Sequence, residues 1–177
     1  MRVWVVGAFL AIGVSWPAAA CILVPPWVPK LPNETAEQYA ERRDQAYDDR
    51  EAVWEFNRQQ ALVEKASDAF LAEVVASTVT SEGHNVATVK PVLVVKGTLP
   101  DQLVRLETYS LPGCVPHPAI DGEGALAKKG DLVFAFTGLE PHAEFRPRGI
   151  DSLKTGRILS ETLVEILKAY GLEEADE

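Results

Sequence analysis

The chain has 177 residues, of which 47% are apolar and 24% charged, with 12 Gly, 12 Pro, 2 Cys and 3 His. This composition is that of an ordinary globular domain and excludes a repeat array, a disordered chain and a collagen-like rod. The formal net charge is −9, and the sequence lacks the Lys/Arg clusters that phosphate binding requires. Nucleic acid is therefore not expected as a partner.

The first 20 residues have the pattern of a secretory signal peptide. Arg2 supplies the positive start, residues 3–14 are mostly apolar, and residues 17–20 (Pro-Ala-Ala-Ala) form a small-residue exit. No other apolar run is long enough to span a bilayer. The sequence therefore predicts a secreted or periplasmic protein with no transmembrane span after removal of residues 1–20.

Cys21 and Cys114 are the only two cysteines. Because export would deliver both to an oxidising compartment, we expect a disulfide between them. It would close a loop of about 90 residues, for which the chain-entropy model gives about 4 to 5 kcal/mol. Two alternatives stay open: a lipid anchor on Cys21, which follows three alanines as in a lipoprotein cleavage box, and free thiols. Pro17 and the apolar, proline-stiffened strip at 22–28 fit the lipid anchor poorly.

A long amphipathic helix is predicted over residues 35–66. Thr35 and Gln38 have the spacing of a capping box, and no Pro or Gly interrupts the segment. Its apolar residues fall in pairs seven apart and form one narrow stripe, whose aromatic members are Tyr39, Tyr47 and Trp54. Either the stripe packs on its own domain, or it forms a coiled pairing with a second chain, since its period is close to 3.5.

Five short strands are predicted after the helix, at 69–81, 86–95, 103–109, 131–137 and, weakly, 143–147. Residues 81–85 form a hairpin turn, and Pro91 places its strand at an edge or at a bulge. Residues 110–130 form a long loop that Cys114 would pin. Ser160 caps a second amphipathic helix that ends at Gly171, and 173–177 form an acidic tail.

This order of elements predicts a mainly β protein with flanking helices: a five-stranded OB-like barrel, a long N-terminal helix and a C-terminal helix. Residues 21–172 would form a single domain, into which the helix at 35–66 is inserted.

Several short segments resemble the bacterial relatives of tissue inhibitors of metalloproteinases, in the netrin-like OB-fold superfamily. They are the first cysteine after the signal, residues 92–97 (Val-Leu-Val-Val-Lys-Gly) with Pro100, the Gly113-Cys114 loop, and residues 130–136 (Gly-Asp-Leu-Val-Phe-Ala-Phe). The resemblance covers residue 21 and residues 68–138. It implies a bridge from Cys21 to the barrel and a protease-binding N-terminus of Cys21, Ile22 and Leu23. There the free α-amino group of Cys21 would chelate the zinc of an extracytoplasmic metalloprotease, and Ile22 would enter its specificity pocket. The chain departs from the family in lacking further disulfides, in having Ile22 after the first cysteine, and in its inserted helix.

Catalytic chemistry has no recognisable signature in the sequence. His84, His117 and His142 share no metal-ligand spacing, and no phosphate-cradling glycine loop follows a strand. We therefore expect neither catalytic residues, nor a metal, nor a cofactor. The leading interpretation is a non-enzymatic exported protein-binding module, with Tyr39, Tyr47 and Trp54 on its partner-binding helix face. The alternatives are a metalloprotease inhibitor acting through Cys21 and a lipoprotein anchored through Cys21.

Overall fold

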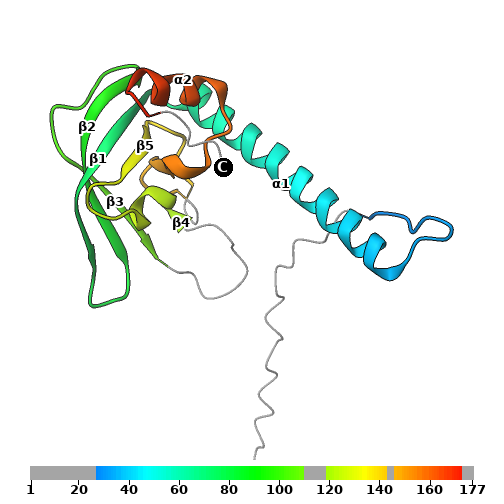
Figure 1. The fold of residues 1–177 in the computed structure, drawn as a ribbon. Helices are drawn as coiled ribbons and strands as arrows, with labels where there is room; N and C mark the ends of the chain where they lie inside the picture. Colours follow the sequence, from blue (N-terminus) through cyan, green and yellow to red (C-terminus); the bar gives the residue numbers. More distant parts are fainter. Residues whose placement is uncertain (1–26, 110–118, 143–145, 173–177) are drawn as a thin grey trace, which may run out of the picture.

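The computed structural model describes residues 27–109, 119–142 and 146–172, and combines one antiparallel sheet with two α-helices (Figure 1). In chain order the helices and strands are α1 (Ala36–Lys65), β1 (Asp68–Val79), β2 (Asn85–Lys96), β3 (Val104–Tyr109), β4 (Ala119–Ile120), β5 (Leu132–Thr137), β6 (Asp151–Lys154) and α2 (Glu161–Ala169). Short 3-10 helices, η1 (Glu123–Leu126) and η2 (Thr155–Arg157), follow β4 and β6. The mainly β class with two flanking helices is confirmed.

The helix boundaries follow the capping residues that the sequence contains. Thr35 is the N-cap of α1, and both hydrogen bonds of its capping box with Gln38 are formed. At the other end of the chain, α2 ends in a Schellman motif, in which Gly171 has φ +86° and the N–H of Leu172 donates to the carbonyl of Leu167. Both predicted helices are confirmed to within a few residues.

The sheet has the strand order β4-β3-β2-β1-β5-β6. β1 and β2 form a long hairpin around the predicted turn, and β1 also pairs with β5 along its first half. The register between β1 and β2 shifts by one residue beside Pro91, between the pairs Leu71–Leu93 and Ala72–Pro91. β3 pairs with β2 only as far as Val89, so the missing N–H of Pro91 costs no ladder bond on that side. The expected bulge or edge position of Pro91 is confirmed.

Alternate residues of β1 and β5 build two hydrophobic clusters, one on each face of the sheet. On one face, Leu71 and Phe134 pack with residues of α2 and the end of α1, among them Leu62 and Leu163. On the other face, the core contains Phe70, Ala72, Val74, Ala87, Val89, Leu106 and, from the η1 region, Ala125 and Ala127. Both faces of β5 are covered, which agrees with its apolar sequence from Leu132 to Phe136 and with the prediction of a central strand.

The prediction of a closed five-stranded barrel is wrong, because the sheet has six strands and stays open with β4 and β6 as its edges. The edges nevertheless approach each other: the Ser152 hydroxyl donates to the carbonyl of Asp121 and accepts from the N–H of Gly124. Gly122 has φ +80°, and a Cβ there would collide with the backbone of Ser152. Side-chain hydrogen bonds, rather than a strand ladder, thus join the two edges.

The last predicted strand and the long loop also need correction. Residues 143–145 lie outside the described part of the chain, and Arg146 forms only an isolated bridge with His142. The strand that pairs with β5 is instead β6, which contributes one large apolar core residue, Leu153. The segment predicted as loop from 110 to 130 contains β4 and η1.

Candidate functional site

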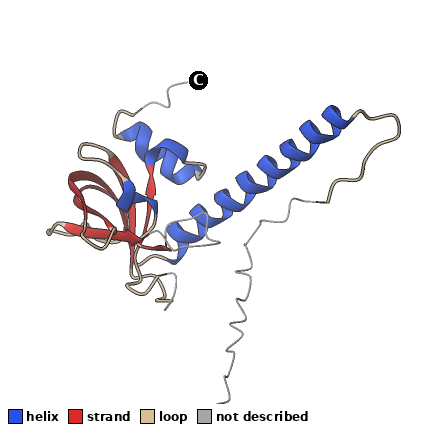
Figure 2. Ribbon diagram, turned by 90° about the horizontal axis from the view of Figure 1, so that it is seen from below, coloured by secondary structure: helices blue, strands red, loops and turns tan. Residues whose placement is uncertain are grey.

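The N-terminal two-thirds of α1 project away from the sheet (Figures 1 and 2). The buried residues of α1 are Glu55, Gln59 and Leu62, all near its C-terminal end. No helix in the described residues is long and apolar enough to cross a membrane. A helix of 30 residues that is fixed only at one end presents most of its surface to other molecules.

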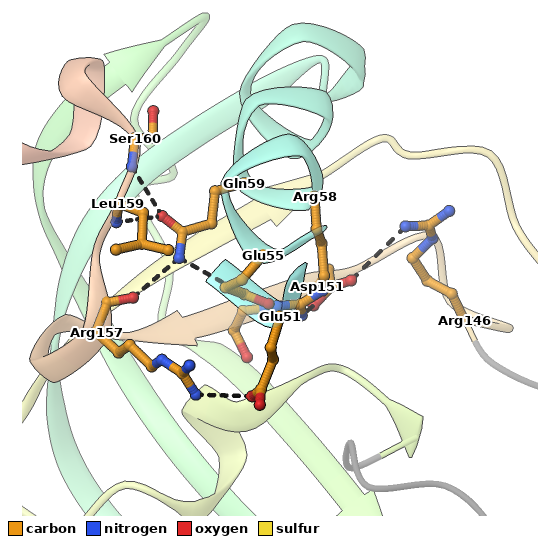
Figure 3. Close-up of polar contacts among 10 residues, drawn as sticks. Glu51, Glu55, Arg58, Gln59, Arg146, Asp151, Arg157, Leu159 and Ser160 are labelled. Carbon is orange, nitrogen blue, oxygen red and sulfur yellow. Dashed lines mark hydrogen bonds and ion pairs between the residues drawn. The ribbon is translucent and has the colours of Figure 1, made fainter. Parts of the chain in front are cut away.

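A buried glutamine fixes α1 to the chain that leads into α2 (Figure 3). The Gln59 side-chain oxygen accepts from the N–H groups of Leu159 (2.8 Å) and Ser160 (3.0 Å). Its Nε2 donates to the Arg157 carbonyl (2.9 Å) and to Glu55 (3.0 Å). The fully buried amide therefore uses both donors and both acceptor positions. Gln59 thereby satisfies the N–H of Ser160, the N-cap residue of α2, whose own side chain makes no cap hydrogen bond.

Ion pairs continue this contact on both sides of Gln59. Arg58 bridges Glu55 (2.9 Å) and Asp151 (3.2 Å), and the second oxygen of Asp151 lies 3.7 Å from Arg146. Burial raises the pKa of the Asp151 carboxyl in spite of these two guanidinium groups. One turn closer to the free end of α1, Glu51 accepts from Arg157 (3.0 Å). We call Glu51, Glu55, Arg58, Gln59 and Leu62 the anchored face of α1.

The aromatic stripe does not lie on the anchored face. At about 100° per residue, the stripe of Tyr39, Tyr47, Trp54 and their apolar neighbours is centred about 150° around the helix axis from Gln59 and Glu55. Trp54 is 48% exposed and Val53 is 61% exposed, while Tyr39 and Tyr47 are half-buried. Packing of the stripe on its own domain holds only at its C-terminal end, where Leu62 enters the core; from Tyr39 to Trp54 the stripe lies away from the mainly polar anchored face.

The start of α1 is stabilised by the segment that precedes it, residues 27–35, which we call the leader segment. Arg42 donates to Glu34 (2.9 and 2.8 Å) and to the Pro29 carbonyl (2.8 Å), and its guanidinium lies 5.9 Å from the ring centre of Tyr39. The hydrogen bond from Arg42 lowers the pKa of Glu34 to about 2. This segment also carries Trp27, which is 87% exposed. The free end of α1 is thus ordered by local contacts.

A second cluster of charges lies where the sheet edges approach each other. Asp121 is fully buried; it accepts from the Glu107 N–H (2.8 Å) and from Arg148 (2.6 Å). Burial raises its pKa to about 6, although both of these donors favour the carboxylate. Asp121 Oδ1 has no hydrogen-bond partner among the described residues. This arrangement ties η1, β3 and the segment before β6 together.

Of the three histidines and two cysteines, the described part of the chain contains His84 and His142. His84 lies 3.1 Å from Glu107 at the hairpin turn, and His142 forms a bridge with Arg146 at the surface. The other sites, His117, Cys21, Ile22, Leu23 and Cys114, lie outside the described part of the chain. Within the described ranges, no group of three His, Cys, Asp or Glu side chains could hold a metal ion. The Cys21–Cys114 disulfide stays a prediction.

Sequence reasoning missed the anchored face and the Asp121 cluster. Arg58 and Asp151 are 93 residues apart in the sequence, and neither belongs to a motif. Gln59 gives no signal either, because a glutamine on a long helix is normally solvated. Only the fold brings these polar side chains into contact.

Comparison with known proteins gives no relative. No family model, no curated protein and no solved structure matches the chain. The resemblance to inhibitors of metalloproteinases therefore stays a prediction from sequence.

Proposed function

We propose that this chain is an exported, non-enzymatic protein-binding module in which the projecting part of α1 contacts a protein partner. The observation that carries the proposal is the split between the two faces of α1. The polar anchored face holds the helix to the sheet, while the aromatic stripe points elsewhere. Exposed aromatic side chains on a rigid element are typical of protein-binding surfaces.

The rigidity of α1 supports this role. A helix end that packs on nothing normally frays, but here a complete capping box and the Arg42–Glu34 pair hold the first turns. Ordering a surface before binding lowers the entropy cost of association. These local contacts make sense for a helix that must already be formed when its partner arrives.

Site-specific photo-cross-linking tests the proposal. A photoreactive amino acid is placed at Tyr47 or Trp54 and, as matched controls on the opposite face of the same helix segment, at Glu41 or Asp48, in cells that produce the protein. We expect one discrete cross-linked protein from Tyr47 and Trp54 and much less of it from the controls. Equal cross-linking from both faces, or none from the stripe, contradicts the proposal.

Export is the second part of the proposal and has its own test. The signal-like residues 1–20 motivate it, and an exported chain would carry Cys21 and Cys114 in an oxidising compartment. Mass spectrometry of the mature chain without reduction separates three cases: a Cys21–Cys114 bridge, a lipid on Cys21, and free thiols. We expect the mature chain to begin at Cys21 with the bridge formed. A chain that keeps residues 1–20 contradicts export.

A further inference from the structure

One stretch of the sheet edge has no partner strand within the described part of the chain. β5 pairs with β1 only as far as Glu73, and Val74 then forms hydrogen bonds with the turn at 130–131. Beyond this point the hairpin of β1 and β2 extends past β5 (Figure 1). Residues 76–79 of β1 are exposed, and we call them the free edge of β1.

The backbone of the free edge points outward at every second residue. The N–H of Thr80 donates to the carbonyl of His84 across the hairpin turn, so the backbone of Thr80 faces β2. This direction alternates along an antiparallel ladder, and the register of β1 and β2 is regular from 76 to 79. Thr78 therefore also faces β2, whereas Ser77 and Val79 direct their N–H and C=O groups away from it. Two donors and two acceptors face outward.

The free edge lacks the features that keep other sheet edges from pairing. Natural sheets protect exposed edges with lysine, with proline or with very short strands. The half of β2 that β3 leaves unpaired carries Lys90 and Pro91, and the edge strands β4 and β6 have only two and four residues. The free edge reads Ala-Ser-Thr-Val, and Val79 is 66% exposed. Such an uncharged segment with β-branched residues favours strand pairing.

We propose that the free edge pairs with the same edge of a second copy of this chain, so that the two sheets join across a two-fold axis. An antiparallel register centred on Thr78 sets Ser77 of each copy opposite Val79 of the other. These are the residues whose backbone groups point outward, so this register forms four hydrogen bonds. The two copies of Thr78 then face each other at a closely spaced position, where Cα atoms lie about 4.5 Å apart.

The charges around this register are complementary. With Thr78 at the centre, Glu82 of the hairpin turn comes opposite Val74 of the other copy. The turn next to Val74 contains Lys128 and Lys129, which are exposed, and the Glu82 side chain is 79% exposed. The dimer therefore brings opposite charges together at both ends and sets no like charges directly opposite each other. This match favours a second copy over an extended strand of a different protein.

The test is the oligomeric state of the mature chain, residues 21–177, by sedimentation equilibrium from about 5 µM to about 1 mM. We expect a reversible monomer–dimer equilibrium that weakens as salt rises. Thr78→Lys should raise the dissociation constant at least about tenfold, because like charges directly opposite each other destabilise an antiparallel pair. Lysine on an exposed edge is compatible with the folded monomer. Thr78→Glu should have the same effect.

An equal mixture of the two variants gives the sharpest result. The introduced lysine then faces the introduced glutamate, so association should recover to within about threefold of the wild type. Recovery also shows that both variants are folded. The matched control is Gln102→Lys, which adds the same charge at an exposed bend before β3 and should change the dissociation constant by less than about twofold.

A wild type that stays monomeric, dimerisation that Thr78→Lys leaves unchanged, or a mixture that does not recover overturns the inference. Equal weakening by Gln102→Lys does so as well, because it would reveal an effect of net charge. If a photoreactive residue at Ser77 cross-links a different protein in cells while the purified chain is monomeric, the free edge binds a partner's strand and the inference is wrong. The proposed function does not depend on this outcome, because the aromatic stripe lies on α1 and the free edge on the sheet.

Discussion

Asp121 is a buried carboxylate whose protonation is linked to folding. Its pKa rises from 3.8 to about 6 in the folded protein, chiefly through burial. Between about pH 4 and pH 6 the folded state therefore binds a proton that the unfolded state releases. Stability from this group is fully present below pH 4 and is lost as the pH rises through 6.

Asp121→Asn isolates this linkage. The amide keeps an acceptor for the Glu107 N–H but does not titrate, so the variant should gain stability relative to the wild type as the pH rises from 4 to 7. The gain should approach about 3 kcal/mol, since each unit of pKa shift corresponds to about 1.4 kcal/mol. Urea unfolding at several pH values measures it. Parallel curves for the two proteins would show that Asp121 titrates normally.

Gln59 makes a residue-scale prediction about the joint between α1 and α2. Gln59→Leu removes four hydrogen bonds and leaves two N–H groups and one carbonyl without their partner. We expect a loss of about 2 to 4 kcal/mol in the free energy of unfolding, because each buried polar group left unpaired costs about 1 to 3 kcal/mol. The control is Gln60→Leu, the same change one residue further along the helix, which should alter stability by less than about 0.5 kcal/mol. Similar losses in both variants would contradict the role of Gln59.

At the scale of the element, α1 contains two parts with different stabilities. The anchored part shares the core with α2 and the sheet, so it unfolds with the whole domain. The projecting part has only its capping box, its leader segment and its own hydrogen bonds. Local opening there costs less than global unfolding.

Thr35→Ala tests this division. Loss of an N-cap side chain costs about 1 kcal/mol of helix stability. Because the first turns of α1 pack on nothing in the sheet, we expect the cost to appear as faster amide hydrogen exchange over residues 38–46. Exchange in β1 and β5 and the midpoint of urea unfolding should stay unchanged. An equal loss of global stability would mean that the free end of α1 is coupled to the core.

At the scale of the whole molecule, the sequence predicts the elements that depend on local signals. The capping box predicts the start of α1, and Pro91 predicts an edge or a bulge in its strand. The apolar run at 132–136 predicts a central strand. β6 was not predicted, because its four residues include one large apolar side chain and are too few to show an alternation of apolar and polar residues. Amphipathic reasoning favours packing of an apolar stripe on the domain's own core, and the sequence alone does not decide between that and a partner. Here Gln59 and Arg58 make the inward contact, and no pattern in the sequence announces a polar joint.

The orientation of α1 relative to the sheet should depend on that polar joint. Arg58→Met removes the ion pairs to Glu55 and Asp151 and leaves Asp151 with Arg146 alone, at 3.7 Å. We expect α1 to remain helical but to sample a wider range of angles. Spin-labelled non-canonical residues at the exposed positions Gln45 and Lys90, which leave both cysteines untouched, report the distance between helix and sheet by double electron–electron resonance.

The wild type should give one narrow distance distribution, and Arg58→Met a clearly broader one with an unchanged far-ultraviolet circular dichroism spectrum. Arg43→Met is the matched control, because Arg43 lies on the same helix but pairs only with its exposed neighbour Asp44. Its distribution should stay narrow, since nothing that holds α1 to the sheet has been removed. A broad distribution already present in the wild type would mean that Gln59 and the ion pairs do not fix the helix. The aromatic stripe would then lack the fixed direction that makes it a preformed binding surface.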